Sequence, residues 1–135
     1  MPGARRRLLD SWAILALLND EGGAAAVADH LRAAIELGEA LLVNEINVGE
    51  VYYIVGKHRS IAAAERVLDH LDTLPLEIVG NTYDDVLDAA RLKAVHPLSY
   101  ADACAVATAV RFEAIVVTGD REFETVQELV DVEWL

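Results

Sequence analysis

The stretch AIVVTGDREF, residues 114–123, decides how this chain is expected to fold, because a short apolar run ends there in polar residues. Residues 114–117 predict a buried strand, and Thr118, Gly119 and Asp120 follow it directly. Short, fully apolar strands are typical of a parallel sheet whose two faces are covered by helices. The stretch therefore raises the question of whether other acids in the chain also follow strands.

The rest of the chain alternates short apolar runs with helical patterns. Strands are expected at residues 7–9, 40–43, 76–79 and 114–117, with a weaker fifth at 131–135. Helices are expected at residues 11–19, 22–38, 47–58, 61–72, 83–94 and 98–112. This alternation predicts an α/β fold with a mostly parallel sheet of four to five short strands.

The composition indicates a globular protein with a strong acidic balance. The chain has 135 residues, of which 54% are hydrophobic, and we expect a single domain over residues 1–135. The formal net charge of −12 argues against broad, non-specific binding of nucleic acid. It suits carboxylates gathered around metal ions, or a basic protein partner. Basic groups at residues 5–7, 57–59 and 91–93 could still bind a phosphate chain if they surround one cleft.

The single cysteine and the N-terminal sequence bear on the cellular compartment. Cys104 is the only cysteine, so no disulfide can form within the chain, and we expect a small core residue in a reducing environment. Residues 5–18 join a basic start to an apolar stretch, as a secretory signal does, but Asp10 interrupts that stretch. No apolar run reaches the roughly 20 residues of a membrane span. We therefore expect a cytoplasmic protein that does not insert into a membrane.

Four acids from separate segments fall where a parallel sheet would bring them together. The carboxyl ends of parallel strands lie at one edge of the sheet, and ligands bind beyond that edge. The acids are Asp10 after residues 7–9, Glu50 early in the helix after residues 40–43, Asp102 in the first turn after Pro97, and Asp120 after residues 114–117.

Each of these acids also has a purely structural interpretation. Asp10 can cap the helix at residue 11, residues 47–50 and 99–102 both have the spacing of a capping box, and Asp120 can be a turn residue. The position of Asp102 favours a functional role, because it is the only charged residue between Pro97 and Arg111, on a helix that is apolar almost all round. Glu50 lies on an apolar stripe with Ile46 and Ile54. Burying an ionised carboxylate costs on the order of several kcal/mol, and a charge partner or a metal ion is needed to offset this cost.

Carboxylate oxygens are hard ligands and point to Mg²⁺ or Mn²⁺. Zinc is not expected, because the four histidines, His30, His58, His70 and His96, show no ligand spacing. A divalent cation held by carboxylates activates water and neutralises charge on a phosphoryl group. The chain has no Gly-rich nucleotide loop, so phosphodiester hydrolysis by metal-activated water is the leading hypothesis.

Four segments resemble the PIN-domain ribonucleases, specifically the VapC-type toxins of toxin–antitoxin pairs. They are LLDSWAILALL (8–18), NEINVGEVYY (44–53), LSYADACAVATA (98–109) and IVVTGDREF (115–123), and they occur in the order of that family. The resemblance implies a three-layer α/β/α fold, an RNA substrate and a homodimer, whose close packing the small residues at 101–110 would permit. It also implies a cognate antitoxin that occupies the site with basic or bulky residues.

The resemblance also implies roles for individual residues. It assigns the metal to Asp10, Asp102 and Asp120 as main ligands, with Glu50 as a further ligand or as the group that orients the attacking water. Thr118 matches a hydroxyl that accompanies the last acid. Many family members carry Ser or Thr two residues after the first Asp, where this chain has Trp12, so we assign no role to Ser11.

Two other functions remain open at the level of the sequence. One is a PIN-like module that binds RNA or protein without cutting. The other is a metal-dependent phosphatase acting on a small molecule, which a deep closed pocket and turnover of p-nitrophenyl phosphate would support.

Overall fold

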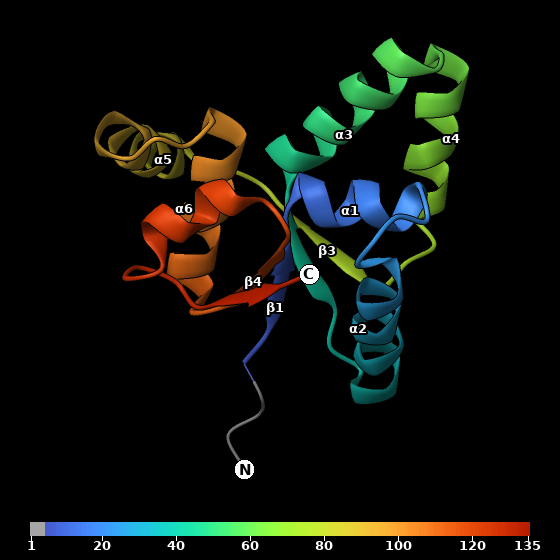
Figure 1. The fold of residues 1–135 in the computed structure, drawn as a ribbon, viewed down its shortest axis with the longest axis horizontal. Coiled ribbons are helices and arrows are strands. Elements are labelled where there is room, and N and C mark those ends of the chain that lie inside the picture. The colour runs from blue at the N-terminus through green and yellow to red at the C-terminus, as the bar shows by residue number, and fades with distance from the viewer. Residues whose placement is uncertain (1–4) are drawn as a thin grey trace.

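A computed structural model describes residues 5–135 (Figure 1). Within this range, five strands alternate with six α-helices and one 3₁₀-helix, η1. In chain order the elements are β1 (Arg7–Leu9), α1 (Ser11–Leu18), α2 (Ala24–Leu37), β2 (Leu41–Asn44), α3 (Glu45–His58), α4 (Ile61–Leu71), β3 (Leu76–Val79), α5 (Tyr83–Val95), α6 (Tyr100–Phe112), β4 (Ile115–Thr118), η1 (Arg121–Val126) and β5 (Val132–Trp134).

The five strands form one parallel sheet in the order β3-β2-β1-β4-β5. The central strand is β1, whose Leu8 lies opposite Leu42 of β2 and Val116 of β4. From β1 the chain moves outward through β2 to β3, and it then crosses back to β4 and β5. This reversal creates a topological switch point between β1 and β4, where α/β proteins bind their ligands.

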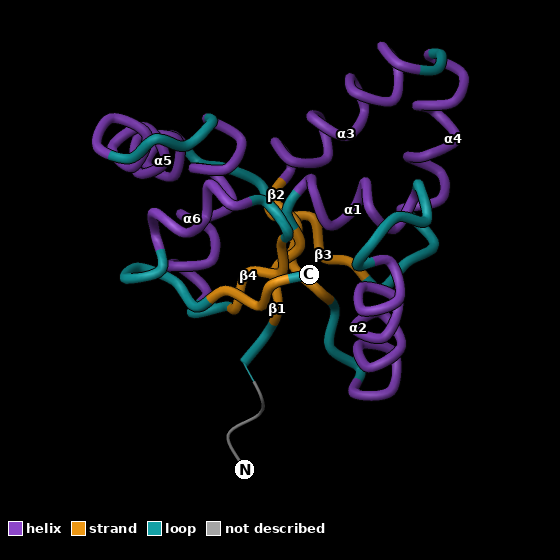
Figure 2. The backbone as a smooth tube through the Cα atoms, viewed as in Figure 1, coloured by secondary structure: helices purple, strands orange, loops and turns teal. Residues whose placement is uncertain are grey.

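Helices cover both faces of the sheet (Figures 1 and 2), with α1 to α4 on one face and α5 and α6 on the other. Residues that alternate along the strands enter different cores, as the pleat requires: Leu9 packs with α1 to α4, and Leu8 packs with α6. Crossover connections are right-handed, so strands added in opposite directions from β1 place their helices on opposite faces. The predicted three-layer α/β/α fold is confirmed.

The predicted helices and strands all occur, with ends within two residues of those expected from the sequence. The weak fifth strand is β5, which pairs in parallel with β4 at the edge of the sheet. The sequence patterns did not indicate η1, because a helix of six residues is too short to show a periodic apolar face.

The predicted start of α3 was wrong. The helix begins at Glu45, and its cap is Asn44, the buried last residue of β2, whose side chain accepts a hydrogen bond from the backbone N–H of Ile46 at 2.9 Å. Residues 47–50 therefore do not form a capping box. Ile46 is 45% exposed, so the stripe that carries Glu50 is not buried in the core as its apolar residues suggested.

The small residues of α6 pack inside the molecule. Ala103, Cys104, Ala105 and Ala109 are buried against the sheet in the core that contains Leu8. The expectation of a buried Cys104 is confirmed. Because their side chains are already covered by the chain itself, these residues do not offer a surface for close packing between two copies.

The basic groups noted in the sequence do not surround one cleft. Three arginines of the first strand region pair with acids: Arg5 with Asp131, Arg6 with Glu77 and Arg7 with Glu133. Residues 57–59 lie at the end of α3, and residues 91–93 lie on α5. Over residues 5–135 we find no helix with both the length and the apolar character that crossing a bilayer requires.

Candidate metal centre

The starts of α1, α3 and α6 meet the end of β4 at the carboxyl edge of the sheet (Figure 1). A cleft of about 310 Å³ lies there. Its lining residues are Ser11, Trp12, Leu15, Glu50, Ile54, Ser99, Asp102, Asp120 and Glu122. The cleft thus gathers residues from four segments that are far apart in the sequence.

Asp10 is fully buried at the end of β1 and caps α1. Its Oδ1 accepts a hydrogen bond from the backbone N–H of Ala13 at 2.9 Å, and its Oδ2 accepts one from the Thr118 hydroxyl at 2.5 Å. The Thr118 oxygen also accepts from the backbone N–H of Asp120 at 3.0 Å. Thr118 therefore joins the first acid to the last one across β1 and β4.

Burial is the main influence on Asp10 and raises its pKa to about 7. The negative charges of Asp120 and Glu50 raise the pKa further, whereas the hydrogen bonds from Thr118 and Ala13 lower it. The ionised carboxylate is therefore costly in the protein alone, and a nearby cation would stabilise it.

Three carboxylates form a tighter group in the cleft. Oxygen atoms of Asp102, Asp120 and Glu122 all lie within 4.8 Å of one another. Asp102 is buried in the first turn of α6, where its backbone N–H donates to the Ser99 hydroxyl at 3.1 Å. Burial, followed by the charges of Asp120 and Asp10, raises the pKa of Asp102 to about 8. Asp120 is partly exposed and Glu122 is exposed.

This group of carboxylates has the chemistry of a divalent-cation site. Among residues 5–135, no lysine or arginine lines the cleft, so no basic side chain compensates the crowded negative charge there. Mg²⁺ and Mn²⁺ bind through a few carboxylates and keep several waters. The donor set of Asp102, Asp120 and Glu122, with Asp10 behind them, fits such an ion.

The structure places the sequence-predicted residues at different depths. Asp102 and Asp120 are brought together, and Thr118 links Asp10 to the backbone N–H of Asp120. Glu50 lines the same cleft but lies outside the group of three, and its carboxylate accepts a hydrogen bond from the Tyr53 hydroxyl at 3.4 Å. The metal-binding roles of these residues stay predictions.

Glu122 was missed by sequence reasoning. It lies in η1, two residues after Asp120, whose Oδ1 accepts a hydrogen bond from the Glu122 backbone N–H at 2.9 Å. This turn brings two acids that are two residues apart to one point. The spacing Asp-x-Glu after a buried strand is the signal that could have indicated it.

Gly119 lies between Thr118 and Asp120, where the Trp12 ring approaches the backbone closely. A Cβ atom at this position would lie 2.4, 2.6 and 2.7 Å from three carbons of that ring. We expect Gly119→Ala to displace the ring and to lower the free energy of unfolding by about 1–3 kcal/mol. Urea unfolding followed by circular dichroism measures this change.

Gly49→Ala is the matched control for this prediction. Gly49 lies within α3, and a Cβ there would have nothing within 4 Å. Since alanine favours a helix over glycine by about 1 kcal/mol, this substitution should stabilise the protein. Equal stability of Gly119→Ala and the wild type would show that the ring has room to move.

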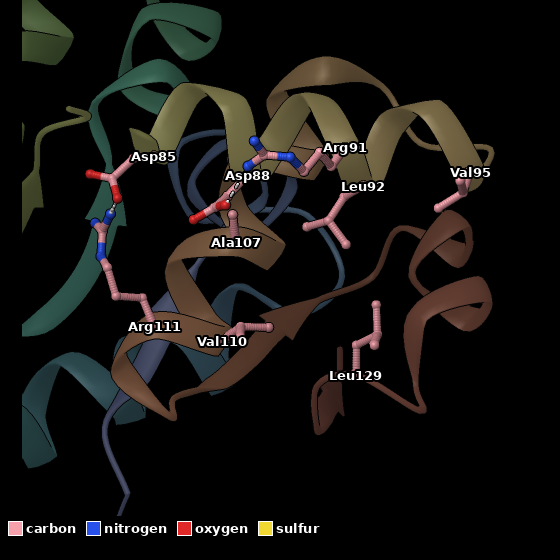
Figure 3. A pocket seen from close by; sticks show the side chains of 9 residues that line it. All are labelled: Asp85, Asp88, Arg91, Leu92, Val95, Ala107, Val110, Arg111 and Leu129. Atoms are coloured by element: carbon pink, nitrogen blue, oxygen red, sulfur yellow. Dashed lines mark hydrogen bonds and ion pairs between the residues drawn. The ribbon is translucent and has the colours of Figure 1, made fainter. Parts of the chain in front are cut away.

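A larger cavity of about 600 Å³ lies between α5 and α6 (Figure 3). Leu92, Val95, Ala107, Val110 and Leu129 line its apolar part. Its two acids each pair with an arginine, Asp85 with Arg111 and Asp88 with Arg91. Because these charges are already compensated, this cavity does not offer a second cation site.

Comparison with known protein families gives a match over nearly the whole chain. The model of the family described as PIN domain matches residues 7–129. No curated protein matches this sequence.

Solved structures show the same fold at low sequence identity. VapBC2 from Rickettsia felis, bound to a DNA fragment from their promoter, has a TM-score of 0.73 and 16% identity, with 94% of this chain and 96% of that chain covered. VapC20 from Mycobacterium tuberculosis, a Sarcin-Ricin loop cleaving toxin, has a TM-score of 0.71 and 16% identity over 89% and 94% of the two chains. A toxin–antitoxin complex from Klebsiella pneumoniae has a TM-score of 0.66 and 18% identity over 94% and 95%.

Proposed function

This chain belongs to the PIN-domain family, and from that premise we propose that it is an endoribonuclease dependent on Mg²⁺ or Mn²⁺, acting as a VapC-type toxin. The observation that carries the proposal is the group of Asp102, Asp120 and Glu122 at the switch point of the sheet. The fold is shared with a toxin that cleaves the Sarcin-Ricin loop, which supports RNA as the substrate class.

The three clustered carboxylates would hold the cation, and the buried Asp10 would add negative charge next to them. When bound, the cation supplies charge neutralisation at the phosphate and a lowered pKa for water. The protein's own contribution is to hold the carboxylates in place: Ser99 fixes the turn of Asp102, and the Asp120 carboxylate is fixed by the N–H of Glu122. Glu50 lines the cleft wall and would orient a water molecule.

Thr118 would position the site without touching the substrate. We expect Thr118→Val to lower the free energy of unfolding by about 1–3 kcal/mol, because it leaves the N–H of Asp120 without an acceptor and the Oδ2 atom of Asp10 without a donor. RNA cleavage should fall about 10- to 100-fold, as for other residues that orient metal ligands. Thr118→Ser should keep most of both properties. Wild-type stability and cleavage in Thr118→Val would contradict this role.

The function is tested by incubating the purified protein with random-sequence single-stranded RNA and Mn²⁺, and by sequencing the new ends. We expect internal cuts that stop when a chelator removes the metal. Asp69→Asn, an exposed acid of α4, serves as the control variant and should cut like the wild type. RNA binding without cutting would instead support a silent binding module, and turnover of p-nitrophenyl phosphate would support a phosphatase.

The partners and location belong to the same proposal. The solved structures with this fold include VapBC complexes and a toxin–antitoxin complex, which supports a cognate antitoxin for this chain. The proposal also includes a homodimer, a cytoplasmic location and a single domain over residues 1–135. Light scattering of the purified protein would test for the dimer. Inhibition of RNA cleavage by a candidate antitoxin would test for the partner.

A further inference from the structure

Trp12 is an aromatic side chain in the wall of the acidic cleft. It is the second residue of α1, two residues after Asp10, and it remains partly exposed. Tryptophan is so large that it is rarely covered on all sides, and part of its ring usually stays accessible. Its lining position in the cleft therefore leaves apolar ring surface available to a ligand.

The position of the Trp12 ring is fixed by the loop that carries Asp120. The ring packs so closely on Gly119 that a Cβ there would lie 2.4 Å from its Cη2 atom. A Cβ at Gly23 would lie 3.5 Å from the Cζ3 atom of the same ring. The ring is therefore held against the residue that precedes Asp120. Because its orientation is already restricted, the side chain loses little conformational freedom when a ligand binds.

The cleft has an apolar wall and an acidic wall. Trp12, Leu15 and Ile54 supply the apolar part. The acids Asp102, Asp120 and Glu122 supply the other part, together with Glu50. A nucleotide has the same division, because a charged phosphate is joined to a flat base with an apolar face. If a cation were held by the carboxylates, it would neutralise the charge of a phosphate in the cleft, and the base joined to that phosphate could contact the apolar wall.

We infer that Trp12 is the platform on which a base next to the reacting phosphate stacks, and that it helps to select unpaired nucleotides. This inference rests on the proposed ribonuclease function and extends it to the way the substrate is recognised. Bases in single strands can leave the helical stack and lie on aromatic side chains, whereas bases in a duplex cannot. Such stacking tolerates every base, so it selects for single strands more than for sequence.

The test compares RNA with a chain that lacks bases. Random-sequence RNA of roughly 12 nucleotides, a length that single-strand grooves cover, is titrated against an abasic ribose-phosphate chain of equal length. Ca²⁺ replaces Mn²⁺, and electrophoresis confirms that the RNA stays intact. The chain has one other tryptophan, Trp134, so Trp134→Phe leaves Trp12 as the only fluorescent indole. Trp134 lies in β5, where the Arg121 guanidinium is 4.7 Å from its ring centre, and phenylalanine keeps an aromatic ring for this contact.

We expect RNA, but not the abasic chain, to quench the fluorescence of Trp12 in the Trp134→Phe protein. Trp12→Leu, which keeps an apolar side chain without a ring, should bind RNA about 5- to 150-fold more weakly, the range for one stacked base. Trp12→Phe should keep most of the affinity. Calorimetry should show unchanged Mn²⁺ binding in both variants, since the carboxylates remain.

Four results would overturn the inference, and they differ in what they leave standing. Unchanged RNA affinity in Trp12→Leu, or equal binding of the abasic chain, would remove the stacking role and leave the ribonuclease proposal standing. Failure of the wild type to bind or cut any RNA of the pool would overturn both. Loss of Mn²⁺ binding in Trp12→Phe would show that the ring only supports the metal centre, which also contradicts a stacking role.

Discussion

Asp102→Asn is expected to abolish saturable Mn²⁺ binding and to reduce RNA cleavage on the order of 10³-fold. Asp102 is the buried member of the carboxylate group, and asparagine has nearly the same shape but no charge. The backbone N–H of residue 102 can still donate to Ser99, so the first turn of α6 should remain intact. Calorimetric titration of the partner-free protein measures the binding, and the random-RNA assay measures the cleavage.

The control for this prediction is Asp69→Asn, which removes the same charge from an exposed position on α4. It should bind Mn²⁺ and cut RNA as the wild type does. If Asp102→Asn unfolds the protein, Asp102 is needed as part of the helix terminus. If the variant still binds the ion with wild-type affinity, the cation is held elsewhere, and the assignment of Asp102, Asp120 and Glu122 is wrong.

The fold could be predicted from the sequence because most of its strands are short apolar runs. Residues 40–43 and 114–117 are fully apolar, and helical patterns separate the first four strands, so a parallel sheet follows. The start of α3 could not be predicted as well. Asn44 and Asn47 are both good caps, and the choice depends on Asn44 donating to Thr108 and Asn81, which are distant in sequence.

The candidate site could be predicted only in part, since the local sequence does not show how deeply each side chain is buried. Asp10 and Asp120 both follow strands, but only the structure shows that one is buried and the other partly exposed. The buried link through Thr118 depends on β1 and β4 being neighbours, although 108 residues separate Thr118 from Asp10. Glu122 lacked a periodic pattern around it, because η1 is so short.

The buried carboxylates of Asp10 and Asp102 should make the metal-free protein less stable at neutral pH than at mildly acidic pH. The pKa values of Asp10 and Asp102 are raised from 3.8 to about 7 and about 8. Between pH 3.8 and those values the folded state binds more protons than the unfolded state, so stability falls as pH rises. We expect a loss of about 2–5 kcal/mol between about pH 5 and about pH 8.

The acidic side of this profile has the opposite sign. The backbone N–H of Thr82 and then Arg111 hold the pKa of Asp85 below its usual value, so its contribution is lost as pH falls toward that lowered pKa. The stability of the metal-free protein should therefore be highest near about pH 5. Urea unfolding in the presence of a chelator, repeated across this pH range, measures the profile.

Asp102→Asn should remove most of the loss at neutral pH, because the neutral amide carries no charge to bury. The substitution that ends metal binding should thus raise the stability of the metal-free protein, whereas Asp69→Asn should keep the wild-type pH dependence. Mn²⁺ at about 100 times its dissociation constant should stabilise the wild type by about 2.7 kcal/mol at neutral pH and leave Asp102→Asn unchanged. A wild-type stability that rises from about pH 5 to about pH 8 without metal would mean that these carboxylates are already compensated within the protein.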